Sequence, residues 1–291
     1  MKIGFIGLGV MGAPMAGHLH RVFGLVGIHT RTRSKADPLL SQGVAWFETP
    51  QALAQQCDVV CTMLGFPPDV HAVYFGPEGI LAGAHSGLCC IDFTTTRPQL
   101  AKDIASQLTT CGGFFFDAPV SGGDVGARQA TLSIMVGGSK TQFPIIQSLL
   151  EAVGQKVVYQ GHAGAGQHTK MTNQIVIAGT MIGVCEALLY GVRAGLDLET
   201  MLSSIRPGAA GCWTLENLAP RILKQDFEPG FYIEHFVKDM EIALNEASRL
   251  GICLPGLALV HQLYRAAQNI GLGKKGTQAL YRVLESLASP T

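Results

Sequence analysis

Charged residues are scarce in this sequence, and their scarcity narrows the range of possible partners. Only 14% of the 291 residues are charged, and the formal net charge is zero, whereas soluble domains carry ~25% charged residues. A neutral chain offers nucleic acid or an anionic membrane no broad electrostatic attraction. We therefore expect a small-molecule ligand, with any phosphate held locally. The 47% of apolar residues indicates much buried surface, including subunit interfaces of a homodimer or homotetramer.

Metal-binding and redox motifs are also missing. The chain has eight cysteines but contains neither a Cys-x-x-Cys pair nor a His-Glu-x-x-His motif. Cys57 and Cys61 flank one apolar segment, and Cys89 and Cys90 lie within another. We interpret the cysteines as small buried hydrophobic residues of a reducing compartment. No metal site is expected.

Targeting and membrane segments are not evident either. The chain starts with an apolar segment that is typical of a core strand rather than of a signal peptide. The longest apolar run, residues 175–185, ends at Glu186 and is shorter than the ~20 residues that span a bilayer. We expect a cytoplasmic protein that does not contact the membrane.

The first half of the chain alternates short apolar runs with helical patterns, which predicts a doubly wound parallel sheet. The predicted strands are residues 2–6, 25–29, 58–63, 88–92, 114–117, 132–136 and 156–159. The predicted helices between them are residues 11–23, 35–42, 50–56, 98–111 and 141–153. After the small-residue segment at 161–166 the pattern is helical, with helices at 167–194, 198–205, 215–224, 233–250, 256–270 and 277–287. We therefore predict a Rossmann-type α/β domain at residues 1–162 and an all-helical domain at residues 163–291.

A glycine-rich turn follows the first predicted strand and precedes the first predicted helix. Its sequence is Gly7-Leu8-Gly9-Val10-Met11-Gly12. The first glycine permits a tight turn, the second lets the backbone approach a pyrophosphate, and the third lets the helix pack on the sheet. The amides at the start of the helix point at the anion. In this context the pattern indicates a dinucleotide site; the alternative is a purely structural turn.

The second predicted strand ends without the acidic residue that an NAD site places about 20 residues after the glycines. Thr30-Arg31-Thr32 stands there instead, followed by Lys35. A guanidinium can bind a 2′-phosphate at two points and stack on adenine. This favours NADP over NAD, with NAD still possible. The alternative interpretation is a solvated basic loop.

Two later blocks carry candidate chemistry. Ser121-Gly122-Gly123 exposes successive amides beside a hydroxyl, which suits a carboxylate, although an ordinary glycine turn has the same sequence. Lys170, Asn173 and Gln174 share one face of a predicted helix. Burial would bring the pKa of this lysine toward neutrality, as acid–base work requires; the alternative is a lysine whose tip reaches water. We interpret Lys238-Asp239 by itself as a solvated ion pair.

These blocks, together with Asp92-Phe93-Thr94-Thr95 and Phe236-Val237-Lys238-Asp239-Met240, resemble those of the β-hydroxyacid dehydrogenases. That family includes 3-hydroxyisobutyrate dehydrogenase, tartronate semialdehyde reductase and the glyoxylate/succinic semialdehyde reductases, and more distantly 6-phosphogluconate dehydrogenase. The resemblance spans nearly the whole chain. It implies an NAD(P)-dependent oxidoreductase that interconverts a small β-hydroxy acid and its semialdehyde in a cleft between the two domains.

The resemblance also implies residue roles. Lys170 would be the general acid or base, with Asn173 or Gln174 orienting the substrate. Substrate contacts would come from Ser121, Gly122, Gly123, Phe231 and Trp213. Cofactor contacts would come from Gly7, Leu8, Gly9, Val10, Met11, Gly12, Thr30, Arg31, Thr32, Lys35, Met63, Leu64, Thr95, Lys238 and Asp239.

Three departures from the family pattern bear on specificity. Thr30 replaces the Asn of the Asn-Arg-Thr found in NADP-preferring members. Gln174 occupies the fourth position after the lysine, where many members carry Asn, and Lys-x-x-Asn-Gln looks like the tartronate semialdehyde reductase subgroup. Trp213 lies in a stretch that differs from its relatives and is a candidate for shaping the pocket.

Two other functions share this architecture. An imine reductase usually lacks the lysine, so Lys170 together with Ser121-Gly122-Gly123 argues against it. A cofactor-binding regulatory module without catalysis would have no need for Lys170, Ser121 and Thr95 together. The reduction of tartronate semialdehyde, of succinic semialdehyde or of glyoxylate remains an alternative within the family.

Overall fold

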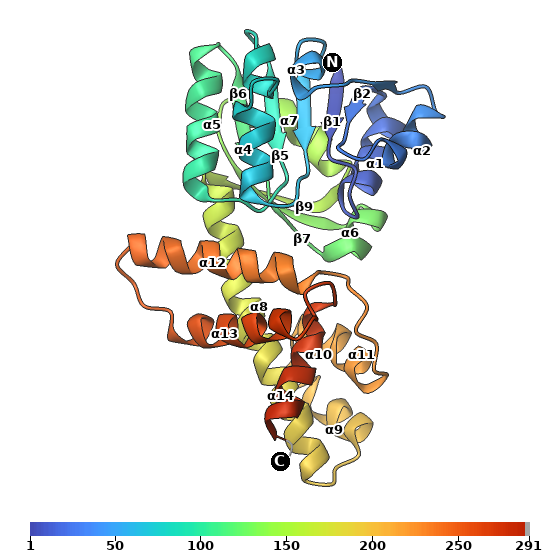
Figure 1. The fold of residues 1–291 in the computed structure, drawn as a ribbon, viewed down its shortest axis with the longest axis vertical. Helices are drawn as coiled ribbons and strands as arrows, with labels where there is room; N and C mark the ends of the chain where they lie inside the picture. Colours follow the sequence, from blue (N-terminus) through green and yellow to red (C-terminus); the bar gives the residue numbers. More distant parts are fainter. Residues whose placement is uncertain (289–291) are drawn as a thin grey trace. The chain divides into compact units, whose positions relative to one another are not determined.

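The computed structural model describes residues 1–288 and divides the chain into two compact units (Figure 1). The first unit ends at Lys170 and the second begins at Met171. This division falls inside the long helix α8 (Ala165–Arg193), a little beyond the predicted domain boundary. Lys170 therefore belongs to the first unit, and Asn173 and Gln174 belong to the second. Each unit is described by itself.

The first unit is built on a nine-stranded sheet with the order β3-β2-β1-β4-β5-β6-β8-β7 and with β9 paired to β8. The strands are β1 (Ile3–Ile6), β2 (Leu25–His29), β3 (Ala45–Trp46), β4 (Val59–Thr62), β5 (Cys89–Asp92), β6 (Phe114–Asp117), β7 (Val120–Ser121), β8 (Leu132–Gly137) and β9 (Gly154–Gly161). The Rossmann-type arrangement predicted from the sequence is confirmed.

The expectation of a fully parallel sheet is wrong at β8, which pairs antiparallel with both β6 and β7. The connection from Ser121 to Leu132 is shorter than the dozen or more residues that a parallel crossover needs, so the chain folds back on itself. Strands β3 and β7 were not predicted because two residues carry no periodicity.

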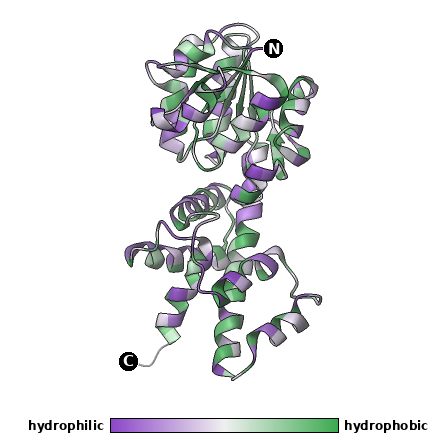
Figure 2. Cartoon of the chain, turned by 90° about the vertical axis from the view of Figure 1, so that its right-hand side faces the viewer, coloured by the Kyte–Doolittle hydropathy of each residue, from purple (hydrophilic) through white to green (hydrophobic). Residues whose placement is uncertain are grey.

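Helices cover both faces of the sheet, and the strand side chains alternate between two cores. On β1, Ile3 and Phe5 enter the core beneath α1, α6 and α7, whereas Ile6 enters the core beneath α3, α4 and α5. The helices are α1 (Gly12–Phe23), α2 (Asp37–Leu40), α3 (Pro50–Ala54), α4 (Pro67–Phe75), α5 (Pro98–Thr110), α6 (Gly123–Gln129) and α7 (Phe143–Glu151). The sequence did not predict α4 or α6. Figure 2 shows the strands of the first unit mostly in the green of apolar residues, between helices that mix green and purple residues.

The second unit is all helical. After α8 come α9 (Leu198–Ile205), α10 (Trp213–Asn217), α11 (Ala219–Leu223), α12 (Ile233–Arg249), α13 (Pro255–Asn269) and α14 (Leu280–Ala288). Phe236 on α12 packs edge-on against Tyr264 on α13, with ring centroids 5.0 Å apart. The single helix predicted at residues 215–224 is two short helices, because Pro220 has no amide to continue the first one.

Helix α8 is, by length and composition, long and apolar enough to cross a membrane, with a mean hydropathy of 1.9 in its most apolar window. The expectation that no segment reaches that length is therefore wrong. The helix contributes Met181, Cys185 and Leu188 to the core of the second unit. A core helix passes the same test, so this property alone is weak evidence for a membrane span.

The cysteines differ in exposure: five are buried, Cys212 is half-buried and two are exposed. Burial raises the pKa of the Cys57 and Cys89 thiols to about 12, which keeps them protonated and unreactive. Cys111 in the first unit and Cys253 in the second are exposed.

Candidate active site

The glycine turn lies at the carboxyl end of β1, between the ends of β2 and β4. Gly7 has a positive φ of 96°, and a side chain there would collide with the Met63 carbonyl. A side chain at Gly12 would collide with the Gly7 carbonyl, whereas a Cβ at Gly9 would meet no atom within 4 Å. The turn is therefore tightly packed at Gly7 and Gly12 and open at Gly9. This arrangement leaves room for a pyrophosphate at the start of α1.

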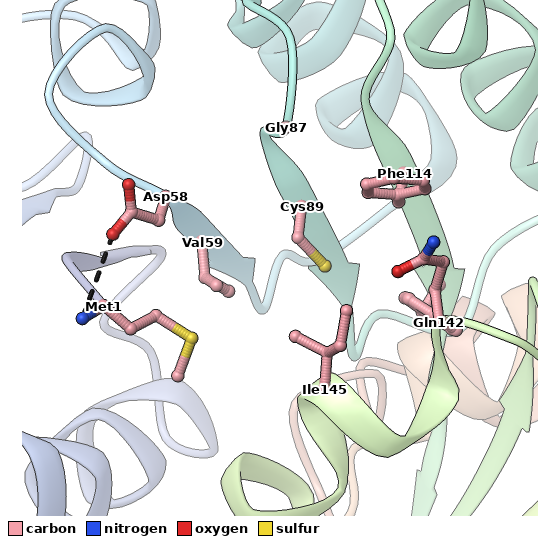
Figure 3. Close-up of a pocket in the computed structure, with 9 residues that line it drawn as sticks. Met1, Asp58, Val59, Gly87, Cys89, Phe114, Gln142 and Ile145 are labelled. Carbon is pink, nitrogen blue, oxygen red and sulfur yellow. Dashed lines mark ion pairs between the residues drawn. The ribbon is translucent and has the colours of Figure 1, made fainter.

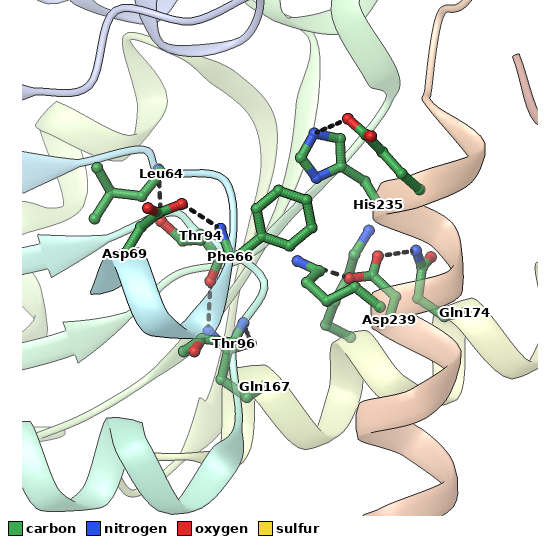
Figure 4. A network of polar contacts seen from close by, with 12 residues as sticks. Leu64, Phe66, Asp69, Thr94, Thr96, Gln167, Gln174, His235 and Asp239 are labelled. Carbon is green, nitrogen blue, oxygen red and sulfur yellow. Dashed lines mark hydrogen bonds and ion pairs between the residues drawn. The ribbon is translucent and has the colours of Figure 1, made fainter. Parts of the chain in front are cut away.

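Arg31 follows β2 and its side chain is 84% exposed. Its Nη1 forms an ion pair of 2.9 Å with Oδ1 of Asp69, a residue that the sequence did not single out. Oδ2 of Asp69 accepts a bond of 3.1 Å from the Phe66 amide, so the carboxylate caps α4 (Figure 4). The available signal was Pro67-Pro68-Asp69, a typical helix start after a strand. Thr30 is buried beside the turn, with its hydroxyl 3.5 Å from the Leu8 amide.

The loops after β4 and β5 are joined by a buried polar network. Asp92 Oδ1 accepts bonds from the Thr62 hydroxyl at 2.7 Å and from the Thr94 amide at 3.0 Å. The Thr94 hydroxyl accepts a bond of 2.8 Å from the Leu64 amide. Desolvation raises the Asp92 pKa to about 6, against the lowering effect of bonds from Thr94 and Thr62. Met63, Leu64 and Thr95, which were predicted to contact the cofactor, lie in these loops.

The loop after β5 is also tied to the first turn of α8. The amide of Thr96 donates to the Gln167 side-chain oxygen at 2.9 Å, and the Gln167 side-chain nitrogen donates to the Thr94 carbonyl at 2.8 Å. Figure 4 shows these two hydrogen bonds between Gln167 and the loop. Gln167 is fully buried and was not predicted as a functional residue.

Asp117, at the end of β6, caps the start of α8. Its Oδ1 accepts a bond from the Gly164 amide and its Oδ2 one from the Gln167 amide, both at 2.8 Å. Burial raises the pKa of this carboxyl, against the lowering effect of the backbone bonds. A side chain at Gly137 or Gly166 would collide with the Asp117 carboxylate. The absence of side chains at Gly137 and Gly166 therefore leaves room for the Asp117 carboxylate to contact the start of α8.

Lys170 lies in the first turns of α8 and is 7% exposed. Its Nζ donates a bond of 2.8 Å to the Val120 carbonyl. Ser121-Gly122-Gly123 follows directly, with positive φ angles at both glycines and α6 beginning at Gly123. The first unit thus brings together the predicted lysine and the predicted amide-rich segment.

The second unit holds the remaining candidates. Asn173 donates to the Gln174 oxygen at 2.8 Å, and Gln174 donates to Oδ2 of Asp239 at 2.5 Å. Lys238 Nζ lies 2.9 Å from Oδ1 of Asp239, and these side chains are only 12% and 2% exposed. The interpretation of Lys238-Asp239 as a solvated pair is therefore wrong, because the pair is buried at the base of a network that reaches α8.

Phe231 and Trp213 differ in their environment. Phe231 is partly buried and packs on Phe236, with ring centroids 5.8 Å apart. Trp213 is 64% exposed at the start of α10. Their predicted contact with substrate stays a prediction.

A small cavity lies at the opposite edge of the sheet, beside the amino ends of β4 and β5 (Figure 3). It is lined by Asp58, Cys89, Phe114 and Ile145, among others. Ligands of open α/β sheets bind at the carboxyl ends of the strands, so this cavity is separate from the candidate site. Within residues 1–288, no group of three or more His, Cys, Asp and Glu side chains is placed to hold a metal ion.

The cap on α8 can be tested by Asp117→Asn. The amide offers one oxygen where two backbone amides need acceptors, so we expect a loss of about 2 kcal/mol in the free energy of unfolding. Turnover should fall about 10- to 100-fold, since the turn that carries Lys170 loses its anchor. Urea unfolding and steady-state kinetics measure the two effects. Asp103→Asn, on the exposed face of α5, is the matched control, and an Asp117 variant indistinguishable from it would contradict this role.

The buried Asp92 predicts a specific pH dependence. Between pH 3.8 and about 6 the folded protein keeps a proton that the unfolded chain releases, so Asp92 makes the folded state less stable as the pH rises through this window. Asp92→Asn removes this effect. The stability of the wild type relative to the variant should therefore drop by roughly 2 kcal/mol between pH 4 and pH 7. Thermal unfolding of both proteins across this range measures the difference; a difference independent of pH would refute the shift.

Comparison with known proteins assigns both units. Residues 2–161 match the NAD-binding domain of 6-phosphogluconate dehydrogenase, and residues 164–284 match the NAD-binding domain of NADP-dependent 3-hydroxyisobutyrate dehydrogenase. A probable mitochondrial 3-hydroxyisobutyrate dehydrogenase-like protein of Arabidopsis thaliana is 46% identical over 98% of this chain and 86% of its own length. The 2-hydroxy-3-oxopropionate reductase of Escherichia coli is 37% identical over 99% of both chains.

Solved structures agree with this assignment. The 3-hydroxyisobutyrate dehydrogenase of Mycobacterium tuberculosis, solved with L-serine, has a TM-score of 0.89 at 29% identity and covers 97% of this chain and 98% of its own. Psf3, solved with NADP+ and 2-OPP, has a TM-score of 0.88 at 26% identity, over 97% and 99% of the two chains. The chain therefore carries nicotinamide-dinucleotide-binding domains, and it belongs to the β-hydroxyacid dehydrogenase family.

Proposed function

We propose that this enzyme interconverts a small β-hydroxy acid and its semialdehyde, with 3-hydroxyisobutyrate as the leading substrate. The observation that carries the proposal is the bond of 2.8 Å from Lys170 to the Val120 carbonyl. It supports the proposal because the buried Lys170 amino group bonds to the carbonyl of the residue that directly precedes Ser121-Gly122-Gly123. A β-hydroxy acid carries its carboxylate and its reacting oxygen close together, and this segment offers a partner for each.

The residues divide the work by their chemistry. The amides at Gly122 and Gly123 and the hydroxyl of Ser121 bind the carboxylate and orient the substrate. Lys170 donates a proton to the carbonyl oxygen during reduction and removes the hydroxyl proton during oxidation. The nicotinamide, when bound, supplies or accepts the hydride at the neighbouring carbon. Val120 and Asp117 keep the lysine in position through the strand and the helix cap.

A second substrate, tartronate semialdehyde, is supported by two observations. Lys170-x-x-Asn173-Gln174 follows the pattern of that subgroup, and the Escherichia coli relative carries the corresponding name, 2-hydroxy-3-oxopropionate reductase. Kinetics with 3-hydroxyisobutyrate, tartronate semialdehyde, succinic semialdehyde and glyoxylate separates the candidates by their kcat/KM.

We further propose that NADP is the preferred cofactor. Arg31 is exposed at the end of β2, where a guanidinium can bind a 2′-phosphate. Thr32 and the short 3-10 helix Arg33–Ala36, which carries Lys35, follow directly and add a hydroxyl and a second positive charge.

Substitution of the lysine tests the reaction. Lys170→Ala should lower kcat by about 10²- to 10⁴-fold, since it removes the proton donor, while the dissociation constant of the cofactor stays nearly unchanged. Stopped-flow hydride transfer and cofactor titration measure the two quantities. Lys156→Ala, at an exposed position of β9, is the matched control. Turnover in Lys170→Ala that equals this control would overturn the assignment.

Substitution of the arginine tests the cofactor preference. Arg31→Ala should raise the KM for NADPH about tenfold or more, because a charge-assisted pair with phosphate is lost, and should leave the KM for NADH almost unchanged. Arg33→Ala is the control, since Arg33 is also exposed in the same loop. If the ratio of the two KM values is the same in Arg31→Ala as in the wild type, the preference for NADP is wrongly assigned.

A further inference from the structure

The ion pair between Arg31 and Asp69 has one partner that is held by a second hydrogen bond and one partner that is largely exposed. Asp69 is the third residue of α4, its Oδ2 accepts the Phe66 amide, and its side chain is 23% exposed. The Arg31 guanidinium bonds to Asp69 through Nη1, and the Arg31 side chain is 84% exposed. Because a long exposed side chain reorients easily whereas a capping carboxylate does not, Asp69 determines where the guanidinium rests.

The pair also has a particular place in the sheet. Arg31 follows β2 and Asp69 follows β4, and these two strands are the neighbours of β1. The ion pair therefore joins the loops on either side of the carboxyl end of β1, where the glycine turn begins. The carboxylate lies on the same side of the site as the adenosine ribose expected beside Arg31.

We propose that Asp69 is a specificity-determining residue that supplies, from α4, the acid missing at the end of β2. This inference rests on the proposed role of Arg31 in NADP binding. A 2′-phosphate that pairs with Arg31 competes with the Asp69 carboxylate for the guanidinium and sits beside its negative charge. A 2′-hydroxyl, as in NAD, can instead donate a hydrogen bond to a carboxylate. Asp69 thus reduces the discrimination against NAD that Arg31 creates.

A second ion pair nearby provides the comparison. Arg33 and Glu48 lie 3.5 Å apart, and their side chains are 63% and 79% exposed. Glu48 is not a helix cap and follows the short edge strand β3, away from the glycine turn. Removal of its charge changes the net charge of the protein by the same amount as a change at Asp69, so Glu48→Gln is a matched control for long-range electrostatics.

The test is Asp69→Asn, which keeps an oxygen for the Phe66 amide and removes the charge. Isothermal titration with NADP+ and with NAD+, without substrate, gives the two dissociation constants directly. We expect the affinity for NADP+ to rise about tenfold, as for removal of one like charge a few ångströms from a phosphate in a solvated site, and the affinity for NAD+ to stay equal or fall. High salt should shrink the gain, and Glu48→Gln should show none. A ratio of affinities in Asp69→Asn that is unchanged, or shifted toward NAD+, overturns the proposal.

Arg31→Ala in the same titrations separates this proposal from the one on which it rests. If Arg31→Ala leaves the ratio of NADP+ to NAD+ affinity unchanged, Arg31 does not bind the phosphate, and both proposals fail. If Arg31→Ala lowers the ratio but Asp69→Asn does not raise it, only the role of Asp69 fails. In the double variant the gain from Asp69→Asn should be smaller than in the wild type, because the competition for the guanidinium is gone. If Asp69→Asn raises the affinity for NADP+ equally in the Arg31→Ala background and in the wild type, Asp69 does not compete with the phosphate for the guanidinium.

Discussion

The carboxylate of Asp117 joins the sheet to the helix that carries the candidate acid–base lysine. The first amides of a helix lack partners within the helix, and a buried carboxylate needs donors to offset its desolvation. Here the Asp117 carboxylate accepts bonds from the Gly164 and Gln167 amides, so each side satisfies the other. The same strand-end segment continues to Val120, whose carbonyl fixes Lys170. The segment from Asp117 to Val120 thus fixes both the position of the first turn of α8 and the orientation of the Lys170 side chain.

Charge interactions are screened to different extents at Lys170 and at Arg31. Lys170 is 7% exposed and Arg31 is 84% exposed, so charge interactions near the lysine are screened little and those near the arginine strongly. Single surface ion pairs contribute about 0 to 1 kcal/mol. Cofactor choice is therefore open to change by single surface substitutions, whereas the proposed proton transfer depends on a buried arrangement that several elements hold in common.

Much of the fold could be predicted from the sequence, because glycine turns and long periodic segments are local signals. The pairing of β8 and the strand β7 could not, since they depend on how the chain folds back. The same limit applies to the site. Lys170 and Ser121 lie in recognisable blocks, but Asp117 contacts Gly164, 47 residues away, and Asp69 contacts Arg31, 38 residues away. Asp117 opens the same block as Ser121, and Asp69 stands at a recognisable helix start, but no sequence pattern names the distant residue that either carboxylate contacts.

The distribution of cysteines makes the chain suitable for labelling. In the part that the structure describes, Cys111 and Cys253 are the exposed thiols, one in each compact unit. Cys57 and Cys89 are kept protonated by burial, and Cys212 is half-buried with its sulfur against the Leu215 amide. Thiol-reactive donor and acceptor dyes can therefore be attached to the natural sequence. Energy transfer between them would follow the separation of the two units as cofactor is added.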